Sequence, residues 1–145
     1  MKKMMKLTAL MLIFACFSQS VLAQEGAKKY ENPEWKQIVY IKFEAGKYDE
    51  AMKIVNDYYM KASDKAGVPG PEMALEMRSG KWDMMIIWNM EGGISDMNWE
   101  VSPNNIKWKK ALNEIAGGEE ETKEIMKNYI DMVKDSYSEI ARVRN

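Results

Sequence analysis

Two carboxylates that flank a glycine turn are the side chains best placed to do chemistry. Glu76 and Asp83 lie in two alternating runs, EMALEMR and KWDMMIIWNM, on either side of Ser79-Gly80. If these runs pair as a hairpin, the two carboxylates face each other, and they repel unless one is protonated or a cation lies between them. A pair in that state can act as a general acid or base, so both residues are catalytic candidates.

A basic neighbour gives the same pair a purely structural explanation. Arg78, Lys42 or Arg142 would neutralise it at a solvated rim, and ion-pair networks also perturb titration. This structural alternative is the commoner arrangement for acidic pairs.

Further side chains are expected to hold a ligand near the carboxylates. Tyr40 and Asn89 are expected on the same face of the sheet as the carboxylates and can orient a polar ligand atom. More often, such residues only form hydrogen bonds with one another. Trp99 and Met97 lie in a long loop and would cover the mouth of a cavity as a lid. The full predicted ligand-binding set is Tyr40, Lys42, Glu76, Arg78, Met85, Asn89, Trp99 and Arg142.

The composition excludes several classes of chemistry. The sequence has no histidine, and its one cysteine, Cys16, lies in a segment that we expect to be removed. Thiol nucleophiles, Cys/His zinc sites and Ser-His-Asp catalysis are therefore excluded from the mature chain. Its ten methionines are soft ligands for Cu(I), but most fall on expected core faces, where methionine packs well. We predict no metal and no cofactor.

Residues 1–23 have the pattern of a secretory signal peptide. Three lysines precede an apolar run, and Val21-Leu22-Ala23 fits the cleavage site. The run is shorter than the roughly 20 apolar residues of a membrane anchor. A loose lipobox ending at Cys16 leaves lipidation open as an alternative to cleavage after Ala23. We predict an extracytoplasmic protein, periplasmic or secreted, with a flexible leader (24–34) and one domain (35–145).

The charge of the mature chain argues against a nucleic-acid partner. Removal of the three N-terminal lysines leaves 18 basic and 22 acidic side chains, a net charge of −4. No stripe of lysine and arginine is available to neutralise phosphates. We also expect no membrane association after cleavage.

Hydrophobic periodicity predicts the elements that position these residues. Alternation indicates strands, and apolar residues at spacings of three and four indicate helices. The last segment, 137–143, is either a closing strand or an extension of the helix before it. The predicted elements are strand 35–43, helix 48–66, hairpin strands 72–78 and 81–90, helices 103–116 and 119–136, and strand 137–143.

The hairpin has an expected register. Pairing Arg78 with Lys81 places Glu76 opposite Asp83. One face of the hairpin is then wholly apolar: Met73, Leu75, Met77, Trp82, Met84, Ile86, Trp88 and Met90. The other face is mixed: Ala74, Glu76, Arg78, Asp83, Met85, Ile87 and Asn89.

This order of elements predicts a ferredoxin-like α+β fold. The arrangement βαββααβ gives a four-stranded antiparallel sheet with helices on one face only. The other face is too apolar to be left bare, which predicts a homodimer that pairs through it. The apolar residues expected there are Ile38, Tyr40, Met85, Ile87 and Ile140.

The order of elements, with Ser79-Gly80-Lys81-Trp82-Asp83 running into Met84-Met85-Ile86-Ile87-Trp88, resembles the dimeric α+β barrel superfamily, which includes antibiotic-biosynthesis-monooxygenase-like and NIPSNAP-like domains. The resemblance implies two sheets paired into a barrel, with a cavity in each subunit. Several members bind small apolar molecules, and some oxidise them without metal or flavin. The histidines of many relatives have no counterpart here, so no catalytic residue is carried over.

Three functions are compatible with the sequence. The first is a domain that binds a small, partly apolar molecule in a dimeric barrel. The second is a cofactor-free, monooxygenase-like or isomerase-like enzyme that uses Glu76 or Asp83. The third is a protein-interaction module that docks a partner on the open sheet face, and it predicts a monomer in isolation.

Overall fold

The computed structural model describes residues 26–144. The predicted signal peptide, its cleavage site and Cys16 lie outside these residues. The chain divides into two units, one up to Asn32 and one from Pro33 onward, and the second unit holds the folded domain. Among the described residues, no helix combines the length and apolarity needed to cross a membrane.

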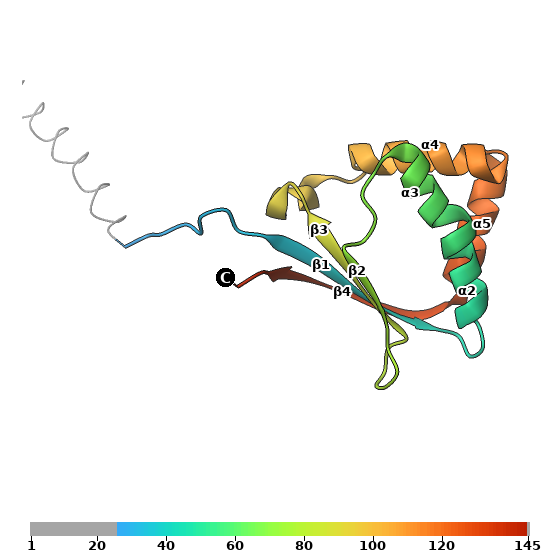
Figure 1. The fold of residues 1–145 in the computed structure, drawn as a ribbon, viewed down its shortest axis with the longest axis horizontal. Coiled ribbons are helices and arrows are strands. Elements are labelled where there is room, and N and C mark those ends of the chain that lie inside the picture. The colour runs from blue at the N-terminus through green and yellow to red at the C-terminus, as the bar shows by residue number, and fades with distance from the viewer. Residues whose placement is uncertain (1–25, 145) are drawn as a thin grey trace, which may run out of the picture. The chain divides into compact units, whose positions relative to one another are not determined.

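The domain is built on a four-stranded antiparallel sheet in the order β2-β3-β1-β4. Strand β1 is central and pairs with both β3 and β4. The helices lie together on one side of the sheet (Figure 1), which confirms the predicted ferredoxin-like α+β fold. The strands are β1 (Trp35–Phe43), β2 (Met73–Glu76), β3 (Met84–Met90) and β4 (Val133–Arg142).

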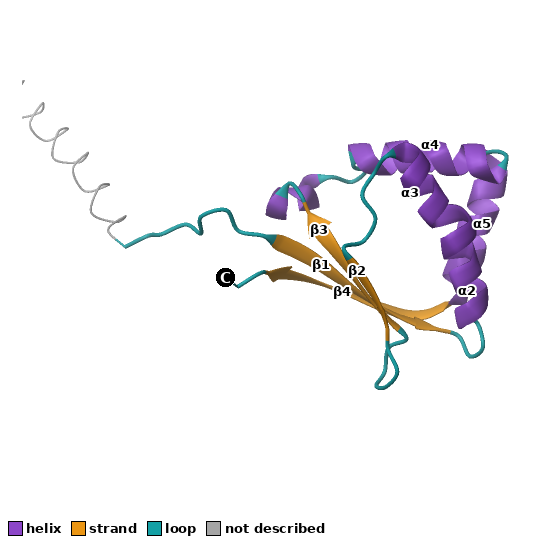
Figure 2. Cartoon of the chain, viewed as in Figure 1, coloured by secondary structure: helices purple, strands orange, loops and turns teal. Residues whose placement is uncertain are grey.

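The helical layer follows the predicted segments closely (Figure 2). The helix predicted over 48–66 is continuous but contains a π-helical turn in its middle, and a short 3-10 helix interrupts the loop before α4. The Ser102 hydroxyl caps α4 by accepting a hydrogen bond from the Asn105 N–H at 3.1 Å. The elements are α2 (Tyr48–Ile54), η3 (Val55–Tyr59), α3 (Met60–Ala66), η4 (Gly93–Asn98), α4 (Pro103–Ala116) and α5 (Glu119–Met132).

The end of α5 differs from the prediction. The helix expected over 119–136 stops at Met132, and β4 begins directly at Val133. The Met132 carbonyl accepts a hydrogen bond from the Glu44 N–H at 2.8 Å, which ties this junction to the end of β1. Pairing with β1 therefore overrides helix propensity, and the strand interpretation of 137–143 is confirmed.

The predicted register of the β2–β3 hairpin is wrong by one residue. Met73 pairs with Ile87 rather than Ile86, and Glu76 pairs with Met84 rather than Asp83. The connection is longer than a tight turn, and a hydrogen bond from the Met77 N–H to the Asp83 carbonyl closes it. The turn glycine supplies one residue with positive φ inside this longer loop.

The one-residue shift moves side chains between the two faces of the sheet. Met73 and Leu75 join Met85 and Ile87 on the face away from the helices, whereas Glu76 lies on the helix side. Ile140 was expected on the open face. It pairs with Gln37, which faces the helices, so Ile140 also lies on the helix side.

The core is small and forms two separate clusters. One lies between the sheet, α2 and α5, and includes Phe43, Met84 and Met132. The second joins α3 to α4 around Ala62 and Leu112. The helices thus pack partly on the sheet and partly on one another.

Candidate functional site

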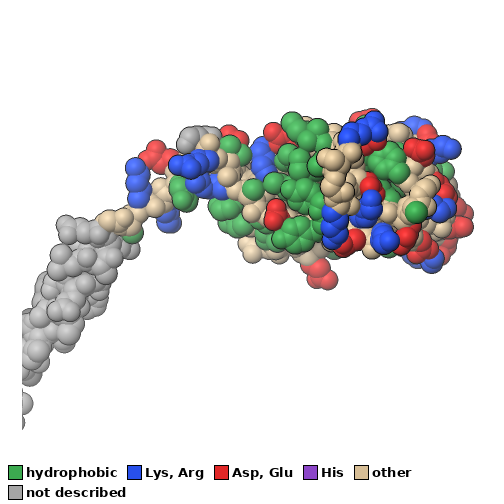
Figure 3. All heavy atoms as spheres, turned by 90° about the horizontal axis from the view of Figure 1, so that it is seen from below, with side chains coloured by type: hydrophobic (Ala, Val, Ile, Leu, Met, Phe, Trp, Pro, Cys, Tyr) green, Lys and Arg blue, Asp and Glu red, His purple; other side chains and the backbone are tan. Residues whose placement is uncertain are grey.

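The side of the sheet that faces away from the helices carries a continuous apolar patch (Figure 3). We call it the open face. Four of its large side chains are strongly exposed or half-exposed: Met73, Leu75 and Tyr137 at 48, 40 and 52 %, and Tyr40 to a lesser degree. Its apolar members are Ile38, Tyr40, Met73, Leu75, Trp82, Met85, Ile87 and Tyr137.

Three aromatic rings gather at one end of the open face. Tyr40 lies 5.9 Å from Trp82 and 6.4 Å from Tyr137, and Trp82 stacks on Tyr137 at 6.5 Å between ring centroids. The Lys81 ammonium sits 4.1 Å from the centre of the Trp82 ring. The sequence pattern assigned Trp82 to the apolar helix side, so only Tyr40 of this cluster was predicted.

Ion pairs border the apolar patch on two sides. Lys81 bonds Asp135 at 2.6 Å, and Lys42 bonds Asp83 at 2.7 Å. At the other end, the Lys36 ammonium contacts Glu72 and donates a hydrogen bond to the side-chain oxygen Oδ1 of Asn89 at 3.3 Å. An apolar centre with a polar rim is the usual anatomy of a protein–protein interface.

The two predicted catalytic carboxylates line one polar pocket at the end of the sheet. The pocket has a volume of about 310 Å³ and also contains Lys42, Tyr48 and Lys134. Glu76 is bound by Arg78 at 3.0 Å, and Asp83 by Lys42. Each carboxylate thus has its own cation, so neither needs to share a proton with the other.

The environment of Asp83 suits a structural anion. Hydrogen bonds from the Lys42 ammonium and from the Phe43 backbone N–H at 2.8 Å hold the pKa of Asp83 below its ordinary value. Burial is the main cause that raises the pKa of the nearby Tyr48 hydroxyl, and the charge of Glu76 adds to it. At neutral pH the Asp83 carboxylate is therefore ionised and the Tyr48 phenol is neutral.

We expect the substitution Asp83→Asn to lower stability at neutral pH by roughly 1–2 kcal/mol, because it weakens two hydrogen bonds to a charged acceptor. Since the pKa is lowered by folding, this contribution is present above the ordinary aspartate pKa and is lost as the pH falls through the folded-state pKa. Urea unfolding of both proteins should give a difference at pH 7 that narrows towards pH 2.5. A difference that stays constant over this range would contradict the assignment.

The other predicted ligand-binding residues are dispersed. Arg142 ends β4 opposite Trp35, on the helix side and at the far end of the sheet from the polar pocket. Asn89 lies on the open face but four positions along β3 from Met85, the residue that pairs with Tyr40. Trp99 follows η4 and is 57 % exposed. The structure therefore brings Lys42, Glu76, Arg78 and Asp83 together and pairs Tyr40 with Met85 on the open face. It places Asn89, Trp99 and Arg142 apart from these groups.

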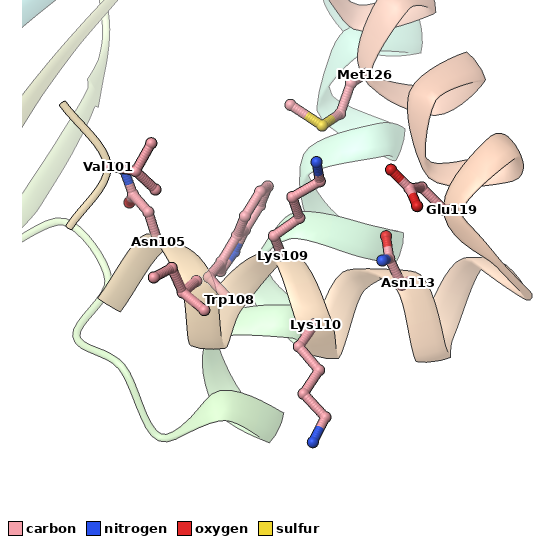
Figure 4. Close-up of a pocket in the computed structure, with 9 residues that line it drawn as sticks. Val101, Asn105, Trp108, Lys109, Lys110, Asn113, Glu119 and Met126 are labelled. Carbon is pink, nitrogen blue, oxygen red and sulfur yellow. The ribbon is translucent and has the colours of Figure 1, made fainter. Parts of the chain in front are cut away.

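A larger hollow lies in the angle between α4 and α5 (Figure 4), and the sequence pattern did not reveal it. Its volume is about 530 Å³, and its lining is mainly apolar. The Trp108 indole N–H donates to the Tyr59 carbonyl at 3.2 Å, and the two rings meet edge to face at 5.3 Å. These contacts fix the orientation of the indole. The lining residues are Val101, Asn105, Ile106, Trp108, Lys109, Lys110, Asn113, Glu119 and Met126.

Polar groups gather at one end of this hollow. In Figure 4, Lys109 extends towards Met126, and the Asn113 amide and the Glu119 carboxylate turn towards each other. The Asn113 Oδ1 atom is buried and accepts no hydrogen bond from any described residue. A buried acceptor without a donor is costly, and it marks a place where a missing group fits.

Residues 26–144 contain no group of three acidic side chains that could hold a metal ion. The polar pocket and the hollow are the sites that contain the candidate functional residues.

The sheet order and the helices on one side define a ferredoxin-like α+β domain. A solved structure with this fold is a NIPSNAP family protein of unknown function from Agrobacterium tumefaciens, with a TM-score of 0.51 and 11 % identity over 81 % of this chain and 94 % of that one. A second NIPSNAP family protein from the same organism has a TM-score of 0.49 at 11 % identity, covering 82 % of this chain and 92 % of its own. A NIPSNAP domain protein from Burkholderia xenovorans has a TM-score of 0.47 at 12 % identity, with 77 % and 94 % covered.

The first of these similarities confirms the ferredoxin-like α+β fold, which the resemblance noted in the sequence had implied. No family model matches the sequence, and no curated protein is recognisably similar to it. At this identity the similarity establishes the fold alone, so function has to be argued from the residues of this chain.

Proposed function

We propose that this protein works outside the cytoplasm as a homodimer that binds a small, partly apolar molecule. The sheets of two subunits pair through their open faces, and each subunit holds its ligand in the hollow between α4 and α5. The signal-peptide pattern of residues 1–23 supports the location.

The apolar open face is the observation that carries this proposal. An exposed apolar patch of this kind on one face of a sheet is unusual for a monomer and marks an interaction site. A second copy of the chain fits because the same patch can pair with itself around a two-fold axis. Within this arrangement Tyr40 and Met85 serve the interface, and the rim pairs Lys42–Asp83 and Lys81–Asp135 help to fix its register.

The hollow is the better of the two pockets for a small apolar ligand. Its volume of about 530 Å³ falls within the range of roughly 300–1,000 Å³ that is typical of small-molecule sites. It is lined by fixed aromatic and aliphatic side chains with a few polar groups at one end. It also belongs to α4 and α5, so pairing of the open faces leaves it accessible.

Binding is better supported than acid–base catalysis at the polar pocket. A general base needs a pKa near the working pH, whereas hydrogen bonding lowers the pKa of Asp83. The two carboxylates also have separate cationic partners. This arrangement favours a structural role for the pair.

Two substitutions at the mouth of the hollow test the proposed site. Val101 and Ile106 line it and are 56 and 61 % exposed, so changing them to aspartate removes apolar wall without opening the core. Each of these two substitutions is expected to weaken binding of a copurifying ligand roughly tenfold, since the contacts of one such side chain contribute about 1.4 kcal/mol. Mass spectrometry of solvent extracts would measure the ligand retained per subunit.

The matched control is Ile94→Asp, which changes an equally exposed residue outside the hollow. The control should retain the ligand, and all three variants should remain dimeric. Equal retention by all three variants would place the ligand elsewhere.

A further inference from the structure

The polar end of the hollow contains groups of opposite character. Among residues 26–144, no carboxylate lies within ion-pairing distance of the Lys109 ammonium. On the next turn of the same helix, Asn113 Oδ1 is buried without a donor. Glu119, at the start of α5, lies beside it and is only loosely engaged, at 3.5 Å from Lys123.

These groups are complementary to two different charged groups on one ligand. An unpaired ammonium attracts a carboxylate. A donorless amide oxygen next to a second carboxylate attracts a cationic donor, such as a primary ammonium, because two acceptors that face each other repel unless a donor lies between them. A carboxylate and an ammonium held a few ångströms apart on one small molecule are the head group of an α-amino acid.

The remainder of the hollow selects the side chain of that molecule. The apolar part of the lining comprises the Trp108 indole, the Met126 thioether and the aliphatic Val101 and Ile106, and the polar Asn105 and Lys110 complete the lining. Aromatic and thioether surfaces pack well against another aromatic ring. The volume of about 530 Å³ admits a single amino acid with a large side chain and leaves room for water.

We infer that the hollow between α4 and α5 binds a free α-amino acid with a large apolar side chain, with its carboxylate on Lys109, its ammonium between Asn113 Oδ1 and Glu119, and its side chain against Trp108 and Met126. The inference rests on the proposed small-molecule-binding function and names the ligand class of the same site.

Four probe molecules separate the three parts of this recognition. L-phenylalanine carries all of them, 2-phenylethylamine lacks the carboxylate, 3-phenylpropionate lacks the ammonium, and glycine lacks the apolar body. Titration of the isotope-labelled chain, residues 24–145, by NMR would follow the Trp108 indole and Asn113 amide signals. L-phenylalanine should move both signals saturably. 2-Phenylethylamine and 3-phenylpropionate should each bind roughly ten- to a hundredfold more weakly, which is the usual effect of losing a charge-assisted hydrogen bond. Glycine should also bind at least about tenfold more weakly, because it buries no apolar side chain.

Two variants assign each head-group contact to a residue. Lys109→Gln should weaken L-phenylalanine about tenfold and leave 2-phenylethylamine unchanged, because that probe has no carboxylate to lose. Asn113→Leu should weaken L-phenylalanine and leave 3-phenylpropionate unchanged. The matched control is Lys107→Gln, on the same helix but outside the hollow, which should bind every probe like the unmodified protein.

Two results would overturn the inference, and they differ in what they say of the proposed function. If L-phenylalanine leaves both signals unmoved while a copurified molecule of another class shifts them, the hollow is a binding site and the ligand class is wrong. If neither the probes nor any copurified molecule perturbs α4 and α5, and Lys109 merely closes onto Asn113 in solution, the binding function fails together with the inference.

Discussion

Replacing Ile87 by glutamate is expected to convert the proposed dimer into a folded monomer. Ile87 lies on β3 near the middle of the open face, paired with Ile38 on one side and Met73 on the other. In a sheet-to-sheet dimer the new carboxylate would be buried without a partner in both subunits, which costs several kcal/mol. The dissociation constant of the dimer should therefore rise by at least about a hundredfold.

Sedimentation equilibrium over a range of protein concentrations would measure this shift. Ile130→Glu is the matched control, because Ile130 is 63 % exposed on α5, away from the open face, and the same change there should leave the dimer intact. Circular dichroism should show the same helix and strand content for both variants. A dimer of unchanged affinity for Ile87→Glu would place the interface elsewhere.

Replacing Phe43 by alanine is expected to remove most of the stability of the fold. The Phe43 side chain is 2 % exposed, and its ring meets Tyr48 and Tyr129 edge to face at 5.8 and 6.1 Å. Removing such a ring usually costs about 3–5 kcal/mol, out of a total that is typically about 5–15 kcal/mol. The described residues contain only nine buried hydrophobic side chains, eight of which are divided between two clusters, so little else compensates.

Urea unfolding at a fixed protein concentration would measure the loss, because the proposed dimer would make the apparent stability depend on concentration. Phe43→Leu is the control, since it keeps most of the buried volume and should cost less than about 1.5 kcal/mol. If Phe43→Ala also costs less than this, the cluster between the sheet, α2 and α5 does not hold the domain together.

The order of elements could be predicted from the sequence because each has a clear local signal. Alternation marks the strand at 35–43, and Ser102 before Pro103 marks the start of α4. The sequence of 137–143 allows two interpretations, because these residues also continue the pattern of the helix before them. Its pairing with β1 is a tertiary contact, and local propensity cannot specify it.

The hairpin register was mispredicted for a physical reason. Serine and glycine in the connection suggested a two-residue turn, whereas Asp83 accepts hydrogen bonds from Lys42 and from the Phe43 N–H and so anchors the loop to β1. This anchoring accompanies a shift of one residue in the β2–β3 pairing, which moves every side chain of β2 to the opposite face of the sheet. It also releases Trp82 to the open face, beside Tyr40.

The candidate site was predictable only in part. The sequence offers Lys42 as one of three cations that could neutralise the acidic pair, and the structure pairs it with Asp83. The hollow was not predictable, since it depends on the angle at which α5 leaves α4. Helical periodicity identified Trp108 and Met126 as core residues, but it does not indicate where the packing of two helices leaves a space beside them.

Native mass spectrometry of residues 24–145, purified after secretion from a bacterial host, tests the central claim most directly because it reads the oligomeric state and bound small molecules together. We predict a mass of two chains with a low-molecular-weight adduct on each subunit. A bare monomer would contradict both the pairing of the open faces and the binding function, and would leave the open face as a docking surface for a different protein.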